Sequence, residues 1–142
     1  MVEHTTDIRV RYSEIDRLGT FYNSRALEWF EVGRTELLRS LGMPYPQMEA
    51  QGVCLPLITA HVDYHRRAGY DERLRIATRL AAEGRARLRF DVAITHADAG
   101  HPVASGYTVH AVTASTGSGS ADRPNQSDAS AGTVQWQIGC SP

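Results

Sequence analysis

Lysine is absent from this chain of 142 residues, and all 15 of its basic residues are arginines. The absence excludes catalysis through a lysine Schiff base and phosphate binding by a P-loop lysine. The two cysteines, Cys54 and Cys140, are too few for a disulfide framework or a zinc site. No apolar run approaches the roughly 20 residues that cross a bilayer, and the first residues do not resemble a secretory signal. We therefore expect a cytoplasmic protein.

Net charge is small as well. Fifteen arginines against 16 acids give a formal charge of −1, which argues against a general nucleic-acid or membrane-surface binder. An anionic ligand would have to be bound by a local cluster of arginines. At about 150 residues per domain the length predicts a single domain, and 42% apolar residues are enough for an ordinary core.

The composition changes near residue 114. Residues 1–113 have a globular composition, whereas residues 114–142 are dominated by small and polar types. Such a segment cannot bury enough apolar surface to offset the entropy of ordering it, so we predict a low-complexity, mobile tail. Val134, Trp136 and Ile138 alternate as in a strand, and docking of that group is the alternative.

One long helix is predicted over residues 24–41, where apolar residues recur at helical spacing. Asn23 or Ser24 is placed to cap its start, and Gly42 followed by Pro44 to end it. The apolar stripe consists of Ala26, Phe30, Gly33, Leu37 and Leu41, widened by Leu27, Trp29 and Leu38.

Alternating runs predict five strands. Residues 7–13 form the first, before the helix, and short breaks between the later runs predict hairpins with antiparallel neighbours. Because the helix is apolar over most of its girth, the sheet must curl around it, which gives an α+β architecture. The later runs are Ile58, Ala60, Val62 and Tyr64; Leu74, Ile76, Thr78 and Leu80; Leu88, Phe90, Val92 and Ile94; and Val103, Ser105, Tyr107, Val109 and Ala111.

The sequence has none of the common signatures of serine hydrolases, NTPases, dinucleotide-binding proteins or zinc enzymes. His61 and His65 have a spacing that would suit a metal on a helix, but the alternation around them predicts a strand with both on its solvent side. We expect no metal site there.

The segment between the first strand and the helix carries the remaining candidate. Asp16 and Gly19 lie in a loop that leads to a helix N-terminus, where free N–H groups and the helix dipole stabilise developing negative charge. Asp16 could attack a carbonyl or deprotonate water. The alternative is that Asp16 only forms a turn.

Residues 9–42 resemble the N-terminal signature of the 4-hydroxybenzoyl-CoA thioesterase/YbgC-like branch of the hotdog-fold acyl-CoA thioesterases, and the resemblance continues more loosely to about residue 113. The departures are Arg25 and Ala26, where such proteins carry a small polar residue and a tyrosine, and the serine-rich tail. The matching positions are Tyr12, Asp16, Gly19, Tyr22, Asn23, Glu31, Arg34, Thr35 and Glu36.

The resemblance implies a hotdog fold, an antiparallel sheet curled around one central helix, and hydrolysis of an acyl-CoA to a carboxylic acid and free CoA. It implies no metal or redox cofactor, coenzyme A being part of the substrate. Asp16 would be the nucleophile or general base, and the backbone N–H of Asn23 the oxyanion donor. Gly19 and Tyr22 would border the substrate, although Tyr22 is equally placed to be a core aromatic residue at the helix entry.

Coenzyme A carries phosphates, which arginine binds by bidentate contacts. The candidates are Arg66 and Arg67, and the group Arg85, Arg87 and Arg89; each could instead be part of a solvated surface. Two other functions remain open. One is a hotdog module that binds acyl-CoA or an acyl-carrier protein without turnover, and the other is a dehydratase, which would need a histidine beside the carboxylate. The resemblance also implies a homodimer or homotetramer, with sheets paired edge to edge and sites at the subunit interface.

Overall fold

The computed structural model describes residues 2–114. The predicted tail lies outside these residues except for Ala114. The elements in chain order are β1 (Val2–Arg9), the 3₁₀ helix η1 (Tyr12–Glu14), α1 (Arg25–Ser40), α2 (Tyr45–Ala50), β2 (Val53–Cys54), β3 (Leu57–Tyr64), β4 (Arg73–Ala82), β5 (Arg87–His96), β6 (Pro102–Ala111) and β7 (Thr113–Ala114).

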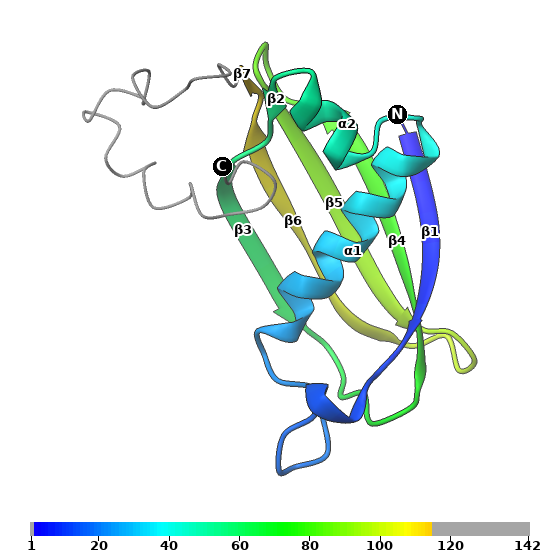
Figure 1. The fold of residues 1–142 in the computed structure, drawn as a ribbon. Coiled ribbons are helices and arrows are strands. Elements are labelled where there is room, and N and C mark those ends of the chain that lie inside the picture. Colours follow the sequence, from blue (N-terminus) through cyan, green and yellow to red (C-terminus); the bar gives the residue numbers. More distant parts are fainter. Residues whose placement is uncertain (1, 115–142) are drawn as a thin grey trace.

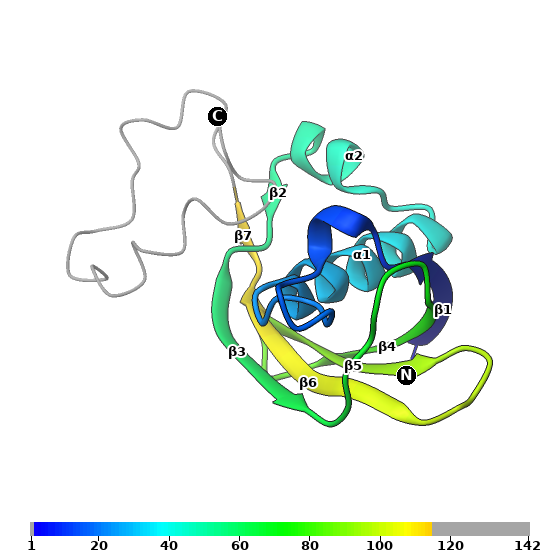
Figure 2. The same cartoon turned by 90° about the horizontal axis from the view of Figure 1, so that it is seen from below.

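Five strands form one antiparallel sheet in the order β1-β4-β5-β6-β3, and β2 pairs with β7 in a second, two-stranded sheet. The large sheet curls around α1, which lies along its concave face (Figures 1 and 2). This arrangement confirms the predicted α+β architecture and the hotdog fold. It also leaves β1 and β3 as the two edges of the sheet.

The helix is placed as the periodicity predicts. Ala26, Phe30 and Leu37 are fully buried against the inner residues of β4 and β5. At its end Gly42 adopts a positive φ of 78°, and its N–H donates to the carbonyl of Arg39 at 3.0 Å. Glycine adopts this left-handed conformation at little cost, which is why the helix ends there.

Two residues of the predicted stripe are not buried. Leu27 and Leu41 are exposed, whereas Arg34 is buried between the stripe positions. The Arg34 guanidinium lies over the ring of Phe90 at 5.8 Å, and its Nε donates to the Tyr45 hydroxyl at 2.8 Å. The short helix α2, which supplies Tyr45, is absent from the sequence prediction because six residues are too few for a periodicity to be visible.

The first strand is displaced from its prediction. It begins at Val2 and ends at Arg9, and the chain then turns into η1, so that Tyr12 is 75% exposed instead of lying on a buried strand face. The strand pairs along its whole length with β4, from Val2 beside Leu80 to Arg9 beside Arg73. The ladder ends where β4 begins, and no local signal in residues 7–13 marks that point.

The predicted hairpin between β3 and β4 is wrong, since β3 pairs with β6 and β4 with β1. Residues 65–72 instead cross one end of the sheet. Just after β3, the N–H of His65 donates to the Val103 carbonyl of β6. Just before β4, the N–H of Asp71 donates to the Val10 carbonyl, which follows β1; both distances are 2.8 Å. Ala68 in the middle of the crossing is fully buried, so this segment closes the end of the core.

The alternation predicted for β6 holds at Val103, which is buried in the core, but not at Ser105 and Tyr107. In the ladder with β5, Thr108 lies beside the buried Phe90 and His110 beside Leu88, so these polar residues point inward. Ser105 and Tyr107 lie on the outer face with Ala93 and Asp91.

Across residues 2–114, no helix is both long and apolar enough to cross a membrane.

Candidate active site

Residues 12–23 consist of η1 and a tight hairpin that leads to the start of α1. Ile15 and Phe21 make an isolated antiparallel bridge, and the N–H of Asp16 donates to the Thr20 carbonyl at 2.8 Å. Gly19 closes the turn with a φ of 80°, a conformation that favours glycine. We call residues 12–23 the entry hairpin. It delivers both predicted catalytic groups, Asp16 and the N–H of Asn23, to the same end of α1.

The two carboxylate oxygens of the half-buried Asp16 side chain differ in their hydrogen bonding. Its Oδ1 accepts hydrogen bonds from the N–H groups of Leu18 at 2.8 Å and Thr20 at 3.4 Å, which is the turn-forming role that the sequence left open. Within residues 2–114, Oδ2 accepts no hydrogen bond. One oxygen therefore fixes the carboxylate while the other remains available for chemistry.

The start of α1 offers free backbone donors. Ser24 occupies the N-cap position, but neither its side chain nor that of Asn23 makes the predicted capping bond. The Asn23 N–H has no acceptor within the described part of the chain, while the Asn23 carbonyl accepts a hydrogen bond from the Tyr64 hydroxyl at 2.7 Å. The peptide at Asn23 is thus held from β3, with its neighbouring N–H open at the positive end of the helix dipole.

A pocket of about 280 Å³ opens at this helix end. Asp16 is not part of its lining but is bonded directly to Thr20, which is. The backbone of Phe21 donates to the Ala68 carbonyl at 3.1 Å, so the crossing segment holds the pocket wall. The lining residues are Thr20, Phe21, Asn23, Tyr64, His65, Arg66 and Arg67.

The aromatic residue that closes the helix entry is Phe21 and not Tyr22. Phe21 is buried against Trp29 with ring centroids 4.9 Å apart, whereas Tyr22 is 47% exposed and lies outside the pocket lining. The alternative of Tyr22 as a core residue is therefore wrong. The bridge between Ile15 and Phe21 decides which of the two adjacent rings points inward.

The structure separates the candidate arginines into two places. Arg66 and Arg67 border the pocket, and Arg67 also donates to the Leu18 carbonyl of the entry hairpin. Arg85 and Arg87 lie in and after the β4–β5 turn, at the opposite end of strands that are 10 residues long. At about 3.3 Å per residue that is roughly 30 Å away. Within one chain, therefore, only the first pair lies at the Asp16 end.

Arg89 is already engaged. Its guanidinium forms hydrogen bonds with Asp91, at 3.1 Å for the shortest, and lies 3.9 Å from the centre of the Tyr107 ring. The hydrogen bond with Asp91 is the main cause that raises the pKa of Arg89. This arrangement matches the solvated strand face that was the alternative for Arg89.

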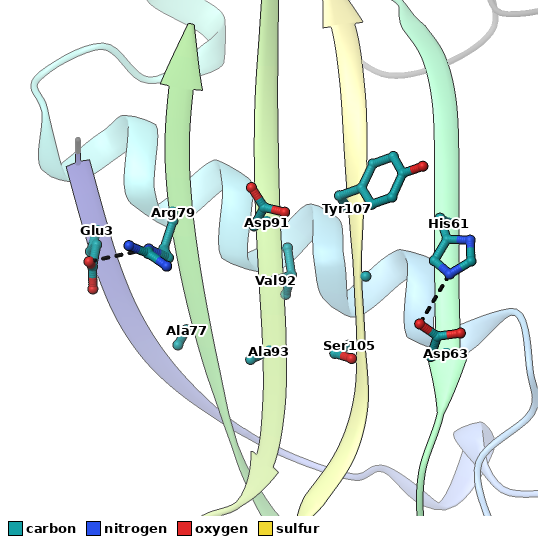
Figure 3. A pocket seen from close by; sticks show the side chains of 11 residues that line it. Glu3, His61, Asp63, Ala77, Arg79, Asp91, Val92, Ala93, Ser105 and Tyr107 are labelled. Carbon is teal, nitrogen blue, oxygen red and sulfur yellow. Dashed lines mark hydrogen bonds and ion pairs between the residues drawn. The ribbon is translucent and has the colours of Figure 1, made fainter. Parts of the chain in front are cut away.

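A larger hollow, about 490 Å³, lies on the outer face of the sheet (Figure 3). Its floor consists of small residues such as Ala77, Ala93 and Ser105. Its charged walls pair among themselves, Glu3 with Arg79 at 3.3 Å and His61 with Asp63 at 3.1 Å. The hollow contains none of the predicted site residues, so we place the candidate site at the smaller pocket.

His61 and His65 lie at different sites in the structure. His61 faces the outer hollow, while His65 lies beyond the end of β3, lines the pocket with Asn23 and forms a hydrogen bond of 2.7 Å with Ser105. Among residues 2–114 no cluster of three or more His, Cys, Asp or Glu side chains could hold a metal ion. Sequence spacing could not place His65 in the pocket, because the crossing of residues 65–72 is a tertiary feature.

Comparison with known proteins gives a consistent family. Residues 10–131 match the thioesterase-like superfamily. The protein YneP of Bacillus subtilis is 41% identical over 66 residues, which are 46% of this chain and 48% of that protein, so the chain matches about half the length of this relative. An acyl-CoA thioesterase, YbgC of Haemophilus influenzae, is 32% identical over 59% of this chain and 62% of its own length.

A solved structure agrees with these sequence matches. The DHNA-CoA thioesterase of Staphylococcus aureus superposes with a TM-score of 0.75 at 29% identity, covering 80% of this chain and 76% of that one. The family match includes the entry hairpin with Asp16, the whole of α1 and every strand from β2 to β7. By its sequence and its hotdog fold, this chain belongs to the thioesterase-like superfamily.

Proposed function

We propose that this protein hydrolyses an acyl-CoA thioester to a carboxylic acid and free CoA, at the pocket beside the start of α1. The observation that carries the proposal is the open N–H of Asn23 at the helix N-terminus, on the same entry hairpin as the Asp16 carboxylate, which has one unengaged oxygen. A donor aimed at the oxygen of a tetrahedral intermediate typically contributes about 3 to 4 kcal/mol to transition-state stabilisation. Acyl-CoA thioesters are also the substrates named for YbgC and for the Staphylococcus aureus enzyme.

Two reaction routes use the same residues. In the first, the Asp16 carboxylate attacks the thioester carbonyl, the C–S bond breaks, and water hydrolyses the resulting anhydride. In the second, Asp16 takes a proton from water as the hydroxide attacks, and the departing CoA thiolate is then protonated. In both routes the carbonyl oxygen becomes negative and accepts a hydrogen bond from the Asn23 N–H.

The phosphates of CoA require cationic partners. Arg66 and Arg67 border the pocket, and Arg66 makes no ion pair with another described residue. Gly19 holds the turn through which Arg67 contacts the entry hairpin. We propose this pair as the nearer phosphate contact, with Arg85 and Arg87 contributing from a second subunit.

A homodimer or homotetramer is part of the same proposal. Strand β3 is an edge of the sheet with an exposed Ile58, and the pocket lies at its Tyr64 end. Antiparallel pairing of two β3 edges would bring the far end of a second copy, with the partner subunit's Arg85 and Arg87, toward this pocket. A cytoplasmic location follows from the substrate, because a polyanionic thioester does not cross membranes.

The substitution Asp16→Asn tests the function. Asparagine keeps the Oδ1 acceptor for Leu18 and Thr20 but can neither attack nor accept a proton, so kcat should fall by about 10² to 10⁴ while binding persists. Free-thiol release from a panel of acyl-CoA substrates measures kcat, and calorimetry with a non-hydrolysable thioether analogue measures binding. Asp63→Asn, on the outer face, is the matched control.

Near-normal turnover by Asp16→Asn would overturn the mechanism. A native protein that binds acyl-CoA but releases no thiol over the whole panel would overturn the hydrolase and leave the binding module.

A further inference from the structure

A fully buried carboxylate lies beside the proposed site and takes no part in the reaction described above. Glu14, the last residue of η1, is 3% exposed. Its Oε1 accepts a hydrogen bond from the Arg11 N–H at 2.7 Å, and its Oε2 accepts bonds from the Arg11 guanidinium at 3.3 Å and from the Trp29 indole at 3.1 Å. We call Arg11, Glu14 and Trp29 the Glu14 clamp.

The clamp keeps its charge. Burial by itself raises the pKa of Glu14, but the hydrogen bonds from the Arg11 backbone and the Trp29 indole, with the Arg11 guanidinium, together lower it below its usual range. Replacing a buried ion pair by apolar side chains of similar volume is often neutral or stabilising, so burial of the Glu14 charge does not by itself account for this residue. What the carboxylate holds in place does.

Glu14 connects the two arms of the entry hairpin to α1. Its backbone carbonyl accepts a hydrogen bond from the Tyr22 N–H at 3.0 Å, on the arm that ends at Asn23. Asp16 lies two residues after Glu14 on the first arm, opposite the arm that carries Tyr22. The side chain of Glu14 reaches Trp29, which is 2% exposed in the second turn of α1. One residue thus lies within two positions of Asp16 and bonds the neighbour of Asn23.

We propose that Glu14 is a positioning residue for the hydrolysis: through Trp29 it fixes the entry hairpin on α1 and so sets the separation between the Asp16 carboxylate and the Asn23 N–H. The proposal rests on the proposed function. The packing of the same indole against Phe21, at 4.9 Å, extends the clamp to the pocket wall. No other buried carboxylate occurs in residues 2–114.

Two substitutions, Glu14→Gln and Trp29→Phe, test this role by removing hydrogen bonds of the clamp. Glu14→Gln keeps the shape but places an NH₂ where the carboxylate accepts, so at least one N–H donor loses its acceptor. Trp29→Phe removes the indole donor together with part of the buried ring volume, and it keeps an aromatic ring against Phe21. A misplacement of about 1 Å near reacting groups costs up to about 10²-fold in rate. We expect kcat to fall about 10- to 100-fold in each variant, with KM for acyl-CoA changed less than about threefold.

The experiment measures kcat and KM for both single variants and the double variant, with thermal melts to show folding. Glu28→Gln is the control, since it makes the same substitution on an exposed glutamate near the start of α1, where Glu28 pairs with Arg25 at 2.7 Å. If the clamp acts as a unit, the double variant is no slower than the slower single variant. Backbone amide spectra should show shifted resonances for Asp16 and Asn23 in Glu14→Gln and unshifted ones in Glu28→Gln.

Wild-type kcat in a folded Glu14→Gln or Trp29→Phe protein would overturn the proposal, as would a rise in KM without loss of kcat. If Glu14→Gln fails to fold, Trp29→Phe decides the question. If the native protein releases no thiol from any acyl-CoA, the proposed function fails, and the spectra alone then test the clamp. Unshifted Asp16 and Asn23 resonances in Glu14→Gln would overturn it independently of activity.

Discussion

Thr78 carries a buried hydroxyl that has no hydrogen-bond partner within the described part of the chain. It lies on β4 facing α1 at Gly33, where a Cβ would come within 2.3 Å of its Oγ1. The helix therefore approaches the sheet so closely that this position of α1 has no room for a side chain. A buried polar atom without a partner costs about 1 to 3 kcal/mol.

We predict that Thr78→Val stabilises the protein by about 1 kcal/mol, because valine keeps the shape and removes the unpaired hydroxyl. Urea unfolding measures the change. Thr108→Val is the matched control, since Thr108 is equally buried but its hydroxyl forms a hydrogen bond of 3.0 Å with His110. That variant should lose stability, and a loss in Thr78→Val as well would show that the Thr78 hydroxyl has a partner.

At the scale of elements, the β4–β5 turn and the β3–β4 crossing are the two proposed contacts for the phosphates of CoA. Replacing Arg85 and Arg87 together by Ala should raise KM for acyl-CoA more than it lowers kcat, because distal phosphate contacts change little between ground and transition state. Steady-state kinetics at low and high salt would measure the effect, which salt should weaken. Arg79→Ala, on the outer face, is the control.

An unchanged KM in the Arg85→Ala, Arg87→Ala double variant would leave the crossing segment as the phosphate contact. In that case Arg66→Ala alone should raise KM for acyl-CoA. Arg66 is the better probe of the two, because Arg67 also holds the Leu18 carbonyl of the entry hairpin.

At the scale of the whole molecule, stability should depend on pH through His110. This fully buried histidine forms hydrogen bonds with Thr108 and the Leu55 carbonyl, and burial together with the charge of Arg34 lowers its pKa to about 4. The folded state therefore keeps His110 neutral, while the unfolded state protonates it below its usual pKa near 6.5. Stability from this group is complete above about pH 6.5 and is lost as the pH falls toward 4.

We predict a loss of about 2 kcal/mol between pH 7 and pH 5, since one pKa unit corresponds to about 1.4 kcal/mol. Free energies of unfolding in urea across this range measure it. His110→Gln stays neutral at every pH, so its stability should change less over the same interval. An equal pH dependence in both proteins would contradict the assignment to His110.

Assembly is the second property at this scale. We expect at least a dimer at micromolar concentration, measured by light scattering, and an Ile58→Arg substitution on the exposed β3 edge should dissociate it and reduce activity without unfolding the subunit. A monomeric and fully active native protein would contradict both the assembly and a site shared between subunits.

The local features of this chain were predictable from sequence because short-range physics decides them. The helix at residues 24–41 and its end at Gly42 follow from side-chain period and backbone conformation. The inner faces of β4 and β5 follow from alternation. The motif around Asp16 and Asn23 marks the loop that we propose as the reactive one.

Tertiary structure alone decided the rest. The order of the strands, the crossing of residues 65–72 and the entry of His65 into the pocket depend on which distant segments pair, and no local pattern records that choice. The inward direction of Phe21 depends on its bridge to Ile15, and the burial of Glu14 depends on the indole of Trp29, 15 positions away. The sequence motif proposed Asp16 and Asn23 as the candidate groups because residue types and their spacing are local, whereas their positions are set by long-range contacts that form only when the sheet has closed around α1.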